Sequence, residues 1–593
     1  MGKKKIVILI LIIAISAIAV LSVDDQYCSG TLNRFNSYEE LKEFLKTRRY
    51  YYDGRFVFAG AAKLSSTPSE SAGESIIDGY SQTNVQVEGV DEADFVKTDG
   101  EYIYLISNQT VYLVKAYPAE NARVLATISA NGTLRQLFIN DGRLVVFYEN
   151  CTGNSFDTFI AVYDVADRAS PMLKREVVAD GCYFDSRMVG DFVYVIVRKP
   201  AYVAEDEVEL PKISQDNQSI VTPADRILYS DISDYSYMFT TIVVVNAQED
   251  SEEPTTETIM SGCTACMYVS LENIYLAKSY NDKTILHRFQ IDGGKVFHVA
   301  DGEVPGNALN QFSMDEFENH FRIATTSWIK MQNPDRILFR LQNNIYVLNL
   351  EMSIVGRIEG IAPGESIYSA RFMGKRSYLV TFRKIDPFFV IDLSDPYNPA
   401  ILGELKIAGY SDYLHPYDEN HVIGIGKETI ADESDRFSWY QGVKISLFDV
   451  SDVSNPRELA KYEIGRRGST TPVLNDHKAF LFDRERNLLV MPVSVAEVNA
   501  SLYSGQIPPT AFGEIVWQGA YVFTVSAERE AIELRGRITH IEDGDLRECS
   551  HYVNRALYID NVLYTISGSM VKMNALADLS EINDLNLNCQ GGN

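Results

Sequence analysis

The sequence lacks the linear motifs that mark most enzymes. It contains no Gly-x-Ser-x-Gly elbow, no His-Glu-x-x-His zinc motif and no glycine-rich phosphate-binding loop. Histidine is scarce, with 8 residues scattered over 593 positions. These absences argue against an attached α/β-hydrolase domain, a zinc protease and a nucleotide-binding fold, and they leave no catalytic residue to assign. An active site assembled from distant parts of the chain would leave no linear pattern, so enzymatic activity stays open.

Basic stripes are also missing after residue 50. The chain has 54 Lys and Arg residues against 81 Asp and Glu residues, which gives a net charge of −27. Such an acidic surface repels phosphate backbones, so we expect no nucleic-acid partner. At 593 residues the chain is longer than one growing hydrophobic core supports, so it must form several domains or one repetitive architecture.

A long apolar run occurs only at the N-terminus. Lys3, Lys4 and Lys5 precede the run Ile6–Val23, which is apolar apart from two serines. This pattern predicts a membrane-inserting helix in residues 1–23, with the lysines in the cytoplasm and everything after Val23 exported. Both an uncleaved signal-anchor and a cleaved signal peptide fit, because the run is short for a membrane span and long for a signal peptide. We therefore expect an extracytoplasmic protein, membrane-anchored or secreted.

Cysteine is sparse but informative if the chain is exported, because thiols pair outside the cytoplasm. The seven cysteines permit many pairings, and local spacing favours three bridges. These are Cys151–Cys182, Cys263–Cys266 and Cys549–Cys589, with Cys28 left over. The Cys263-x-x-Cys266 pair also fits a redox or metal site, but no second ligand pair has suitable spacing for zinc.

The composition divides the chain into three segments. Residues 1–23 are the signal or anchor, and residues 24–83 combine a short helix with a linker rich in Ser and Gly. The helix is predicted at Ser37–Lys46, because Ser37 can cap it, Glu40 follows three residues later, and Leu41 and Leu45 share one face. Residues 84–593 read as strands throughout, with short runs of Val, Ile, Tyr and Phe between turns.

A repeated turn sets the architecture of that region. Three strands end in Asp-x-(Ser/Ala)-Asp followed by Pro, and their first aspartates are Asp164, Asp392 and Asp449. An Asp side chain can accept a hydrogen bond from the backbone N–H two residues on, which predicts a tight turn. The interval from Asp164 to Asp392 is four times the interval from Asp392 to Asp449. The chain therefore repeats a unit whose length is the interval from Asp392 to Asp449.

This phase divides the chain into about nine units of four strands, of which the second is strongly apolar and the last more charged. The second strands are predicted at Tyr102–Ile106, Leu144–Tyr148, Phe192–Val197, Ile274–Leu276, His320–Ala324, Ser377–Phe382, His421–Ile425, Ala479–Phe482 and Val562–Ile566. Four-stranded units that bury their faces only against neighbours must close a ring. The predicted fold is an all-β propeller of eight or nine blades, preceded by the N-terminal helix and a short helical segment.

The stretch Thr83-Asn-Val-Gln-Val-Glu-Gly-Val-Asp-Glu-Ala-Asp-Phe-Val-Lys-Thr-Asp-Gly100 resembles the opening signature of a known family. This family comprises archaeal and bacterial secreted proteins with a C-terminal β-propeller distantly related to WD repeats. The helix around Glu39 and the Asp-x-Ser-Asp turns are also similar to that family. The resemblance covers nearly the whole chain after the anchor and implies a propeller and export. It implies no activity, because the family has none assigned.

The same stretch concentrates carboxylates. Glu88, Asp91, Glu92 and Asp94 lie within seven residues, a density that suits Ca²⁺, which takes six to eight oxygen ligands. The spacing is not that of an EF-hand. The alternative is that this acidic loop leads into the first blade and closes the ring by hydrogen bonds to backbone. Apart from calcium at these residues, no cofactor is predicted.

Three functions remain open. The first is a binding or scaffolding module that holds a protein, peptide or glycan on the propeller face, through the insertions Tyr202–Asp234, Lys427–Gln441 and Val495–Phe512. The second is an extracytoplasmic hydrolase or lyase with acids in the central funnel, where His415 is a candidate lining residue. The third is an envelope assembly factor. Convergent acids or histidines would favour the enzyme, and an aromatic surface would favour binding.

Overall fold

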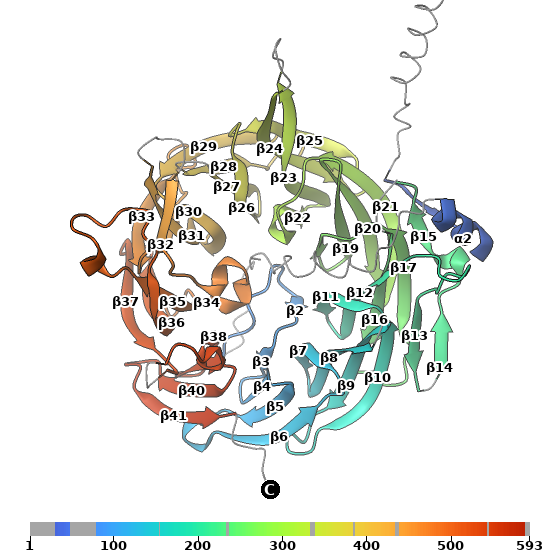
Figure 1. Cartoon of the computed structure of the whole chain (residues 1–593), viewed down its shortest axis with the longest axis horizontal. Helices are drawn as coiled ribbons and strands as arrows, with labels where there is room; N and C mark the ends of the chain where they lie inside the picture. The colour runs from blue at the N-terminus through green and yellow to red at the C-terminus, as the bar shows by residue number, and fades with distance from the viewer. Residues whose placement is uncertain are drawn as a thin grey trace, which may run out of the picture.

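Nine sheets, each with at least four strands, follow one another around a central axis in the part of the chain described by this computed structural model (Figure 1). The structure describes residues 30–47 and 79–587, except 153–154, 217, 233–236, 332–337, 383–385, 433–437 and 542–544. We number the sheets as blades 1 to 9 in chain order. The prediction of an all-β propeller with eight or nine four-stranded blades is confirmed.

Each blade runs from an inner strand beside the axis to an outer strand. The strands of blades 1 to 3 are β3 (Val96–Thr98), β4 (Tyr102–Ser107), β5 (Thr110–Lys115) and β6 (Arg123–Ser129); β7 (Thr133–Asn140), β8 (Arg143–Thr152), β9 (Ser155–Asp164) and β10 (Met172–Asp180); and β11 (Cys182–Val189), β12 (Phe192–Pro200), β16 (Met238–Asn246) and β17 (Thr255–Ser261). Those of blades 4 to 6 are β18 (Cys266–Val269), β19 (Asn273–Tyr280), β20 (Lys283–Asp292) and β21 (Lys295–Pro305); β22 (Met314–Phe317), β23 (His320–Met331), β24 (Leu338–Asn349) and β25 (Ile354–Ile361); and β26 (Ser366–Met373), β27 (Arg376–Phe382), β28 (Asp386–Asp392) and β29 (Ala400–Ile407). Those of blades 7 to 9 are β30 (Tyr410–Asp418), β31 (His421–Ala431), β32 (Ser438–Asp449) and β33 (Arg457–Ile464); β34 (Leu481–Asp483), β35 (Leu488–Glu497), β36 (Glu514–Ser526) and β37 (Ala531–Ile538); and β38 (Val553–Ile559), β39 (Val562–Ser567), β40 (Met570–Ala575) and β41 (Glu581–Asn586).

Eight of the nine predicted second strands occupy the second position of a blade. The ninth prediction, Ala479–Phe482, was wrong, because this run ends in the first strand β34 and the second strand is β35. Phe480 and Phe482 are buried between blades 7 and 8. An inner strand packed in this way is as apolar as a second strand, so composition alone could not separate the two.

The repeated aspartates make the predicted turns between the third and fourth strands of blades 2, 6 and 7. Asp164, Asp392 and Asp449 each accept a hydrogen bond from the backbone N–H two residues on, at 2.9 to 3.0 Å. The second aspartates, Asp167 and Asp395, do the same at 3.0 Å. The interval from Asp392 to Asp449 is therefore the repeat between the neighbouring blades 6 and 7.

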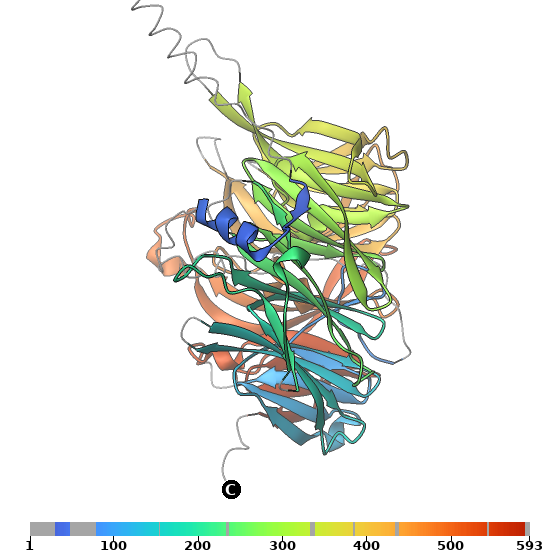
Figure 2. The same ribbon diagram turned by 90° about the vertical axis from the view of Figure 1, so that its right-hand side faces the viewer.

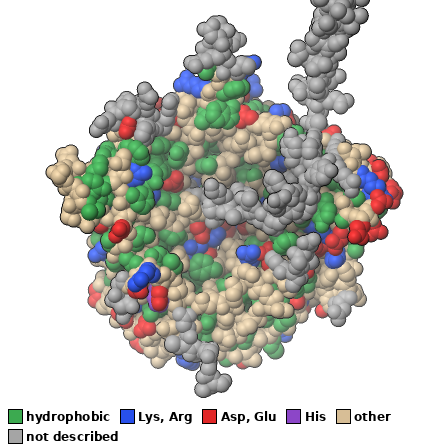
Figure 3. Space-filling model, viewed as in Figure 1, with side chains coloured by type: hydrophobic (Ala, Val, Ile, Leu, Met, Phe, Trp, Pro, Cys, Tyr) green, Lys and Arg blue, Asp and Glu red, His purple; other side chains and the backbone are tan. Residues whose placement is uncertain are grey.

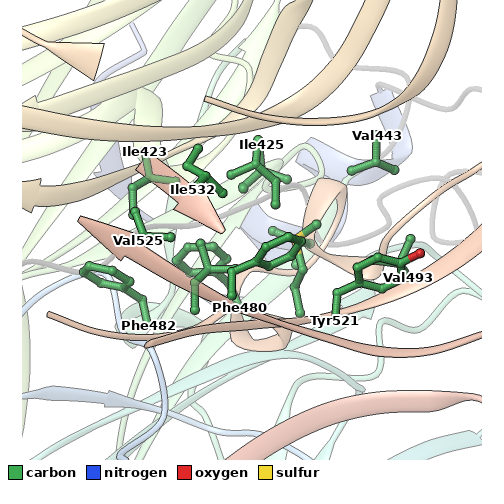
Figure 4. Packing of buried hydrophobic residues seen from close by; sticks show 14 of the residues in the cluster. Ile423, Ile425, Val443, Phe480, Phe482, Val493, Tyr521, Val525 and Ile532 are labelled. Carbon is green, nitrogen blue, oxygen red and sulfur yellow. The ribbon is translucent and has the colours of Figure 1, made fainter. Parts of the chain in front are cut away.

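The core lies between the blades. One cluster joins blades 7 and 8, where Ile423, Ile425 and Val443 face Val493 and Phe523 (Figure 4 shows several of these residues). Blades 1 and 9 pack against each other in the same way, and Tyr112 donates a hydrogen bond to the Leu587 carbonyl at 2.8 Å. The first and last blades thus close the ring, as a propeller requires.

The segment before the ring packs on blade 3. Helix α2 (Tyr38–Thr47) confirms the predicted helix, with the Ser37 hydroxyl accepting a hydrogen bond from the Glu40 N–H at 3.2 Å. The short strands outside the regular blades are β1 (Leu32–Arg34), β2 (Val90–Glu92), β13 (Lys212–Gln215), β14 (Gln218–Val221) and β15 (Leu228–Ser230). β1 pairs with β15 at the edge of the blade 3 sheet, and α2 lies at the outer edge of the ring (Figure 1 and Figure 2).

None of the helices in the described ranges has the length and hydropathy needed to cross a membrane. The predicted membrane segment, residues 1–23, lies outside the described residues, as does most of the predicted linker.

Candidate functional site

Residues 79–95, here the closing segment, cross the central axis and contact several blades before the chain enters blade 1 (Figure 1). The Ser81 hydroxyl accepts a hydrogen bond from the Tyr558 N–H of β38 at 2.8 Å, and the Ser81 N–H donates one to the Tyr558 carbonyl at 2.9 Å. Asn84 donates to the Tyr413 hydroxyl at 2.9 Å and to the His477 carbonyl at 3.1 Å. Gln86 donates to the Gln311 carbonyl at 3.0 Å, in front of β22. The segment therefore ties blades 5, 7, 8 and 9 together from the inside.

The second half of the segment continues this pattern. Strand β2 pairs with β11 of blade 3. Asp94 exchanges two backbone hydrogen bonds with Leu137 of β7 in blade 2. The sequence analysis gave ring closure by hydrogen bonds to backbone as the alternative to calcium binding, and the segment makes hydrogen bonds of that kind.

The four carboxylates proposed as calcium ligands do not form the convergent oxygen cage that the ion needs. Within the described ranges, no three of them bring ligand atoms within 4.8 Å of one another. Glu88 is exposed. Asp91 forms an ion pair with Lys97, Glu92 lies 3.6 Å from Arg187, and Asp94 lies 2.9 Å from Arg555. Protein cations therefore match the charges of Asp91, Glu92 and Asp94.

The ion pairs of Glu92 and Asp94 are buried, and the pair of Asp94 is linked to a further carboxylate. Arg555 donates two hydrogen bonds to Asp94, at 2.9 and 3.0 Å, and also contacts Asp476 of blade 8. Burial opposes the charge of Asp476, but Arg555 and Lys478 outweigh it and hold its pKa well below the ordinary value. Burial likewise opposes the charge of Glu92, and Arg187 leads the cations that lower its pKa to about 2. Asp476 and Glu92 therefore stay ionised at neutral pH.

His477 and His415 are core residues near the axis. Burial lowers the pKa of His477 to about 3, so this ring is neutral although its Nε2 lies 3.4 Å from Glu92 Oε2. Burial also holds the pKa of His415 well below its ordinary value, and its Nδ1 lies 2.9 Å from the Tyr413 hydroxyl. His415 lines a cavity of about 270 Å³ beside the closing segment.

One acid–base pair has shifted pKa values in blade 7. Burial raises the pKa of Asp412 to about 7, and burial lowers the pKa of Lys427 to about 8. Such shifts are typical of functional sites and of structural pairs alike. Lys427 donates to the Ser469 carbonyl, so a structural role accounts for it.

The cysteines do not all follow the predicted pairing. The bridge predicted between Cys263 and Cys266 is not formed, since both are free thiols. Cys263 is exposed and accepts a hydrogen bond from Arg198, whereas Cys266 lies on β18 and burial raises its pKa to about 12. Cys28, Cys589 and the side chain of Cys151 lie outside the described residues, so the other two predicted bridges stay predictions.

Two of the three predicted insertions meet on the surface. Gln441, from the hairpin of β31 and β32, donates to the Pro509 carbonyl at 3.0 Å. The N–H of Gly513 donates to the Arg467 carbonyl at 2.8 Å. Figure 3 shows hydrophobic side chains gathered on the left of the visible face, over the region of β31 to β33. The third insertion, residues 202–234, instead holds α2, with Val208 and Ile227 packed against Leu41.

Arg467 stands at the centre of this meeting point, which we call the Arg467 patch. Its guanidinium carbon lies 4.6 Å from the ring centre of Trp439, 4.7 Å from that of Tyr440 and 5.9 Å from that of Phe512. Two of its nitrogens, Nε and Nη1, are buried without a hydrogen-bond partner among the described residues. Tyr440 is 40% exposed and Phe512 is 64% exposed. An arginine stacked on exposed aromatic rings is the composition that dominates binding hot spots.

Sequence reasoning placed the two loops of this patch but not Arg467. Arg467 lies in the connection between blades 7 and 8, outside both predicted insertions. No local pattern marks it, because its aromatic neighbours are supplied by two different hairpins. A second cluster was also missed: His287, His298 and Asp301 bring ligand atoms within 4.8 Å of one another. Its two histidines appeared in the sequence only as scattered residues.

Comparisons with known proteins agree with the fold. An uncharacterized protein of Methanocaldococcus jannaschii is 28% identical over 90% of this chain and 89% of its own length. An uncharacterized protein of Archaeoglobus fulgidus is 28% identical over 70% of this chain and 75% of its own length. Among solved structures, the WD40 domain of Toxoplasma gondii coronin matches 53% of this chain and 78% of its own, with 10% identity and a TM-score of 0.22, too low to carry an argument. The profile of the family described as beta propeller domain matches residues 80–579, and the chain belongs to that family.

Proposed function

We propose that this protein is an extracytoplasmic binding module, tethered to the membrane by its N-terminus, that holds a protein or peptide partner on the Arg467 patch. The observation that carries the proposal is the stacking of Arg467 on aromatic rings, of which Tyr440 is 40% exposed and Phe512 is 64% exposed. A cation held against exposed rings offers a partner an apolar surface beside a positive charge.

The apolar rim supports a macromolecular partner. The exposed hydrophobic side chains of the two insertions and the adjoining start of β36 are Ile430, Tyr440, Leu502, Ile507, Phe512, Ile515 and Val516. Monomeric proteins seldom expose such groups together unless they bind something. Burial of two or three of these side chains would contribute about 1.5 to 3 kcal/mol each to binding.

The tether is supported by the short distance between the predicted membrane segment and the ring. Gly30 follows Val23 by seven residues, which span at most about 25 Å. β1 then fixes the chain to blade 3. The hairpin of β23 and β24, which projects from blade 5 in Figure 1, adds exposed Trp328 and Phe339 beside Lys330. Aromatic and basic side chains of this kind are typical of membrane interfaces.

Site-specific photo-crosslinking in native membranes tests the binding half. A photoreactive amino acid replaces Tyr440 or Phe512 in the full chain, and Tyr397, an exposed tyrosine in the turn after β28, serves as the matched control. We expect one shared adduct from the two patch positions and none from position 397. The Arg467→Ala variant should lower that adduct at least tenfold. Equal adducts at all three positions, or none at the patch, would refute binding there.

Labelling of intact cells tests location. A membrane-impermeant maleimide should label the Tyr397→Cys variant more strongly than the unchanged chain before lysis. Additional labelling that occurs only after lysis would contradict an extracytoplasmic propeller. Recovery of the labelled protein in the membrane fraction, and its loss after deletion of residues 1–23, tests the tether.

A further inference from the structure

Two histidines and one aspartate converge on the β20–β21 hairpin of blade 4. His287 on β20 stands directly opposite Asp301 on β21, so their side chains point to the same face. His298 precedes Asp301 by three residues, a spacing that would normally place the two on opposite faces. The register shifts by one residue between the Arg288–Ala300 and Phe289–His298 pairs. This bulge reverses the alternation and brings His298 to the face of the other two.

The three side chains meet at a single atom. Asp301 Oδ1 lies 2.8 Å from His287 Nδ1 and 2.7 Å from His298 Nε2. The side chains of His287, Asp301 and His298 are only 2%, 8% and 15% exposed. No other group of three His, Cys, Asp or Glu residues in the described ranges brings its ligand atoms so close together.

We propose that His287, His298 and Asp301 bind a transition-metal ion, with Zn²⁺ as the occupant favoured by the donor set. Two imidazoles and one carboxylate are ligands that Zn²⁺ and its neighbours take, whereas Ca²⁺ and Mg²⁺ prefer oxygen alone. Tetrahedral Zn²⁺ holds its ligand atoms about 3.3 Å apart, so the two contacts to Asp301 would open by about half an ångström. Water is the candidate for the fourth position.

The second oxygen of the aspartate is already engaged in a way that suits a ligand. Asp301 Oδ2 accepts a hydrogen bond from the Leu32 N–H of β1 at 2.8 Å, which fixes the carboxylate and leaves Oδ1 toward the imidazoles. Outer contacts of this type orient metal ligands. The contact of Asp301 with β1, which adds to the pairing of β1 with β15, uses only Oδ2 and requires neither histidine. A metal at Oδ1 would therefore clamp the strand that joins the predicted tether to the ring.

One feature sets the expected affinity. His287 Nε2 is buried and has no hydrogen-bond partner in the described structure. A ligating histidine usually donates its second N–H to a neighbour, and loss of such a contact costs about 10- to 100-fold in affinity. The site should accordingly bind Zn²⁺ more weakly than a fully supported site with the same ligands.

Titration of the purified full chain tests the site. After removal of metal with a chelator, we expect one equivalent of Zn²⁺ in isothermal titration calorimetry, a rise in the melting temperature by mass action, and the visible absorption of low-symmetry Co²⁺ with the cobalt ion. His298→Gln should weaken binding by about 100-fold or more, and Asp301→Asn should do the same while it keeps the acceptor for Leu32. Thermal unfolding of the metal-free variants shows whether they still fold.

Two controls make the outcome decisive. His551→Gln changes a histidine outside the cluster, and Cys263→Ser removes an exposed thiol that could bind zinc by itself. Both should leave the stoichiometry and affinity unchanged. Absence of stoichiometric binding, or binding that survives His298→Gln but is lost in Cys263→Ser, would overturn the proposal. Crosslinking at the Arg467 patch tests a different region, so failure of the metal site and failure of the proposed function can be distinguished.

Discussion

The closing segment and the Arg467 patch use the same kinds of residue in opposite ways. In the closing segment, Asp94 and Glu92 are buried and lie beside Arg555 and Arg187. In the patch, Arg467 lies between aromatic rings, and its Nε and Nη1 have no acceptor among the described residues. Matched buried charges fix the position of backbone, whereas a cation stacked on exposed aromatic rings presents a surface that a partner can cover. The comparison separates what holds the ring together from what it can offer to another molecule.

The largest effect should come from breaking the charge network at the axis. Arg555→Ala leaves the buried Asp94 and the partly buried Asp476 without their shared cation, and we expect a loss of about 3 to 5 kcal/mol in the free energy of unfolding. Urea denaturation of the full chain measures it. Arg547→Ala, which removes an arginine whose side chain is 91% exposed, should change stability by less than about 0.5 kcal/mol. Equal stability of the two variants would show that the network does not hold the ring.

Acid should weaken the same region. Because the folded protein lowers the pKa of His477 from 6.5 to about 3, the unfolded chain takes up a proton that the folded chain refuses. Stability therefore falls as pH drops through this window. The lowered pKa of Glu92, about 2 against 4.5, acts in the same direction below pH 4.5. We expect a lower urea midpoint at pH 5 than at pH 7, and a smaller difference in His477→Gln. An unchanged difference in that variant, as expected for His551→Gln, would exclude His477 as the source.

A smaller loss should follow removal of one polar contact of the closing segment. Asn84→Ala deletes hydrogen bonds to Tyr413 and to the His477 carbonyl, at about 1 kcal/mol each. Tyr397→Phe, which changes a tyrosine that is 62% exposed, should alter stability by less than about 0.5 kcal/mol. Urea midpoints compare the two variants, and equal midpoints would mean that the contacts of Asn84 do not stabilise the ring.

The smallest effect on stability should come from the patch. Phe512→Ser removes a side chain that is 64% exposed, so the free energy of unfolding should stay within about 0.5 kcal/mol of the unchanged chain. Crosslinking from position 440 should nevertheless fall at least tenfold, as expected for a binding hot spot. A large loss of stability with crosslinking unchanged would show that the Arg467 patch stabilises the fold and does not bind the partner.

Parts of the site were predictable where the signal is local. The hydrogen bonds of Asp392 and Asp395 to N–H groups two residues on follow from the turn sequence alone. Ser37 as a helix cap follows from the same kind of reasoning. The insertions around Gln441 and Pro509 could be recognised as loops, but their contact could not, since it depends on how blades 7 and 8 are placed. The carboxylates of the signature were recognised as a group, and their cation partners were not.

The sequence by itself determined the all-β propeller, its blade spacing and its turns, because strand alternation and Asx hydrogen bonds depend on residues a few positions apart. Only the tertiary structure decided which charges are matched. Asp94 and Arg555 are 461 residues apart and meet because the ring closes. Arg467 gains its aromatic neighbours from two hairpins, and His298 turns toward Asp301 because of one bulge. Contacts of this kind depend on where distant backbone lies, and no local pattern carries that information.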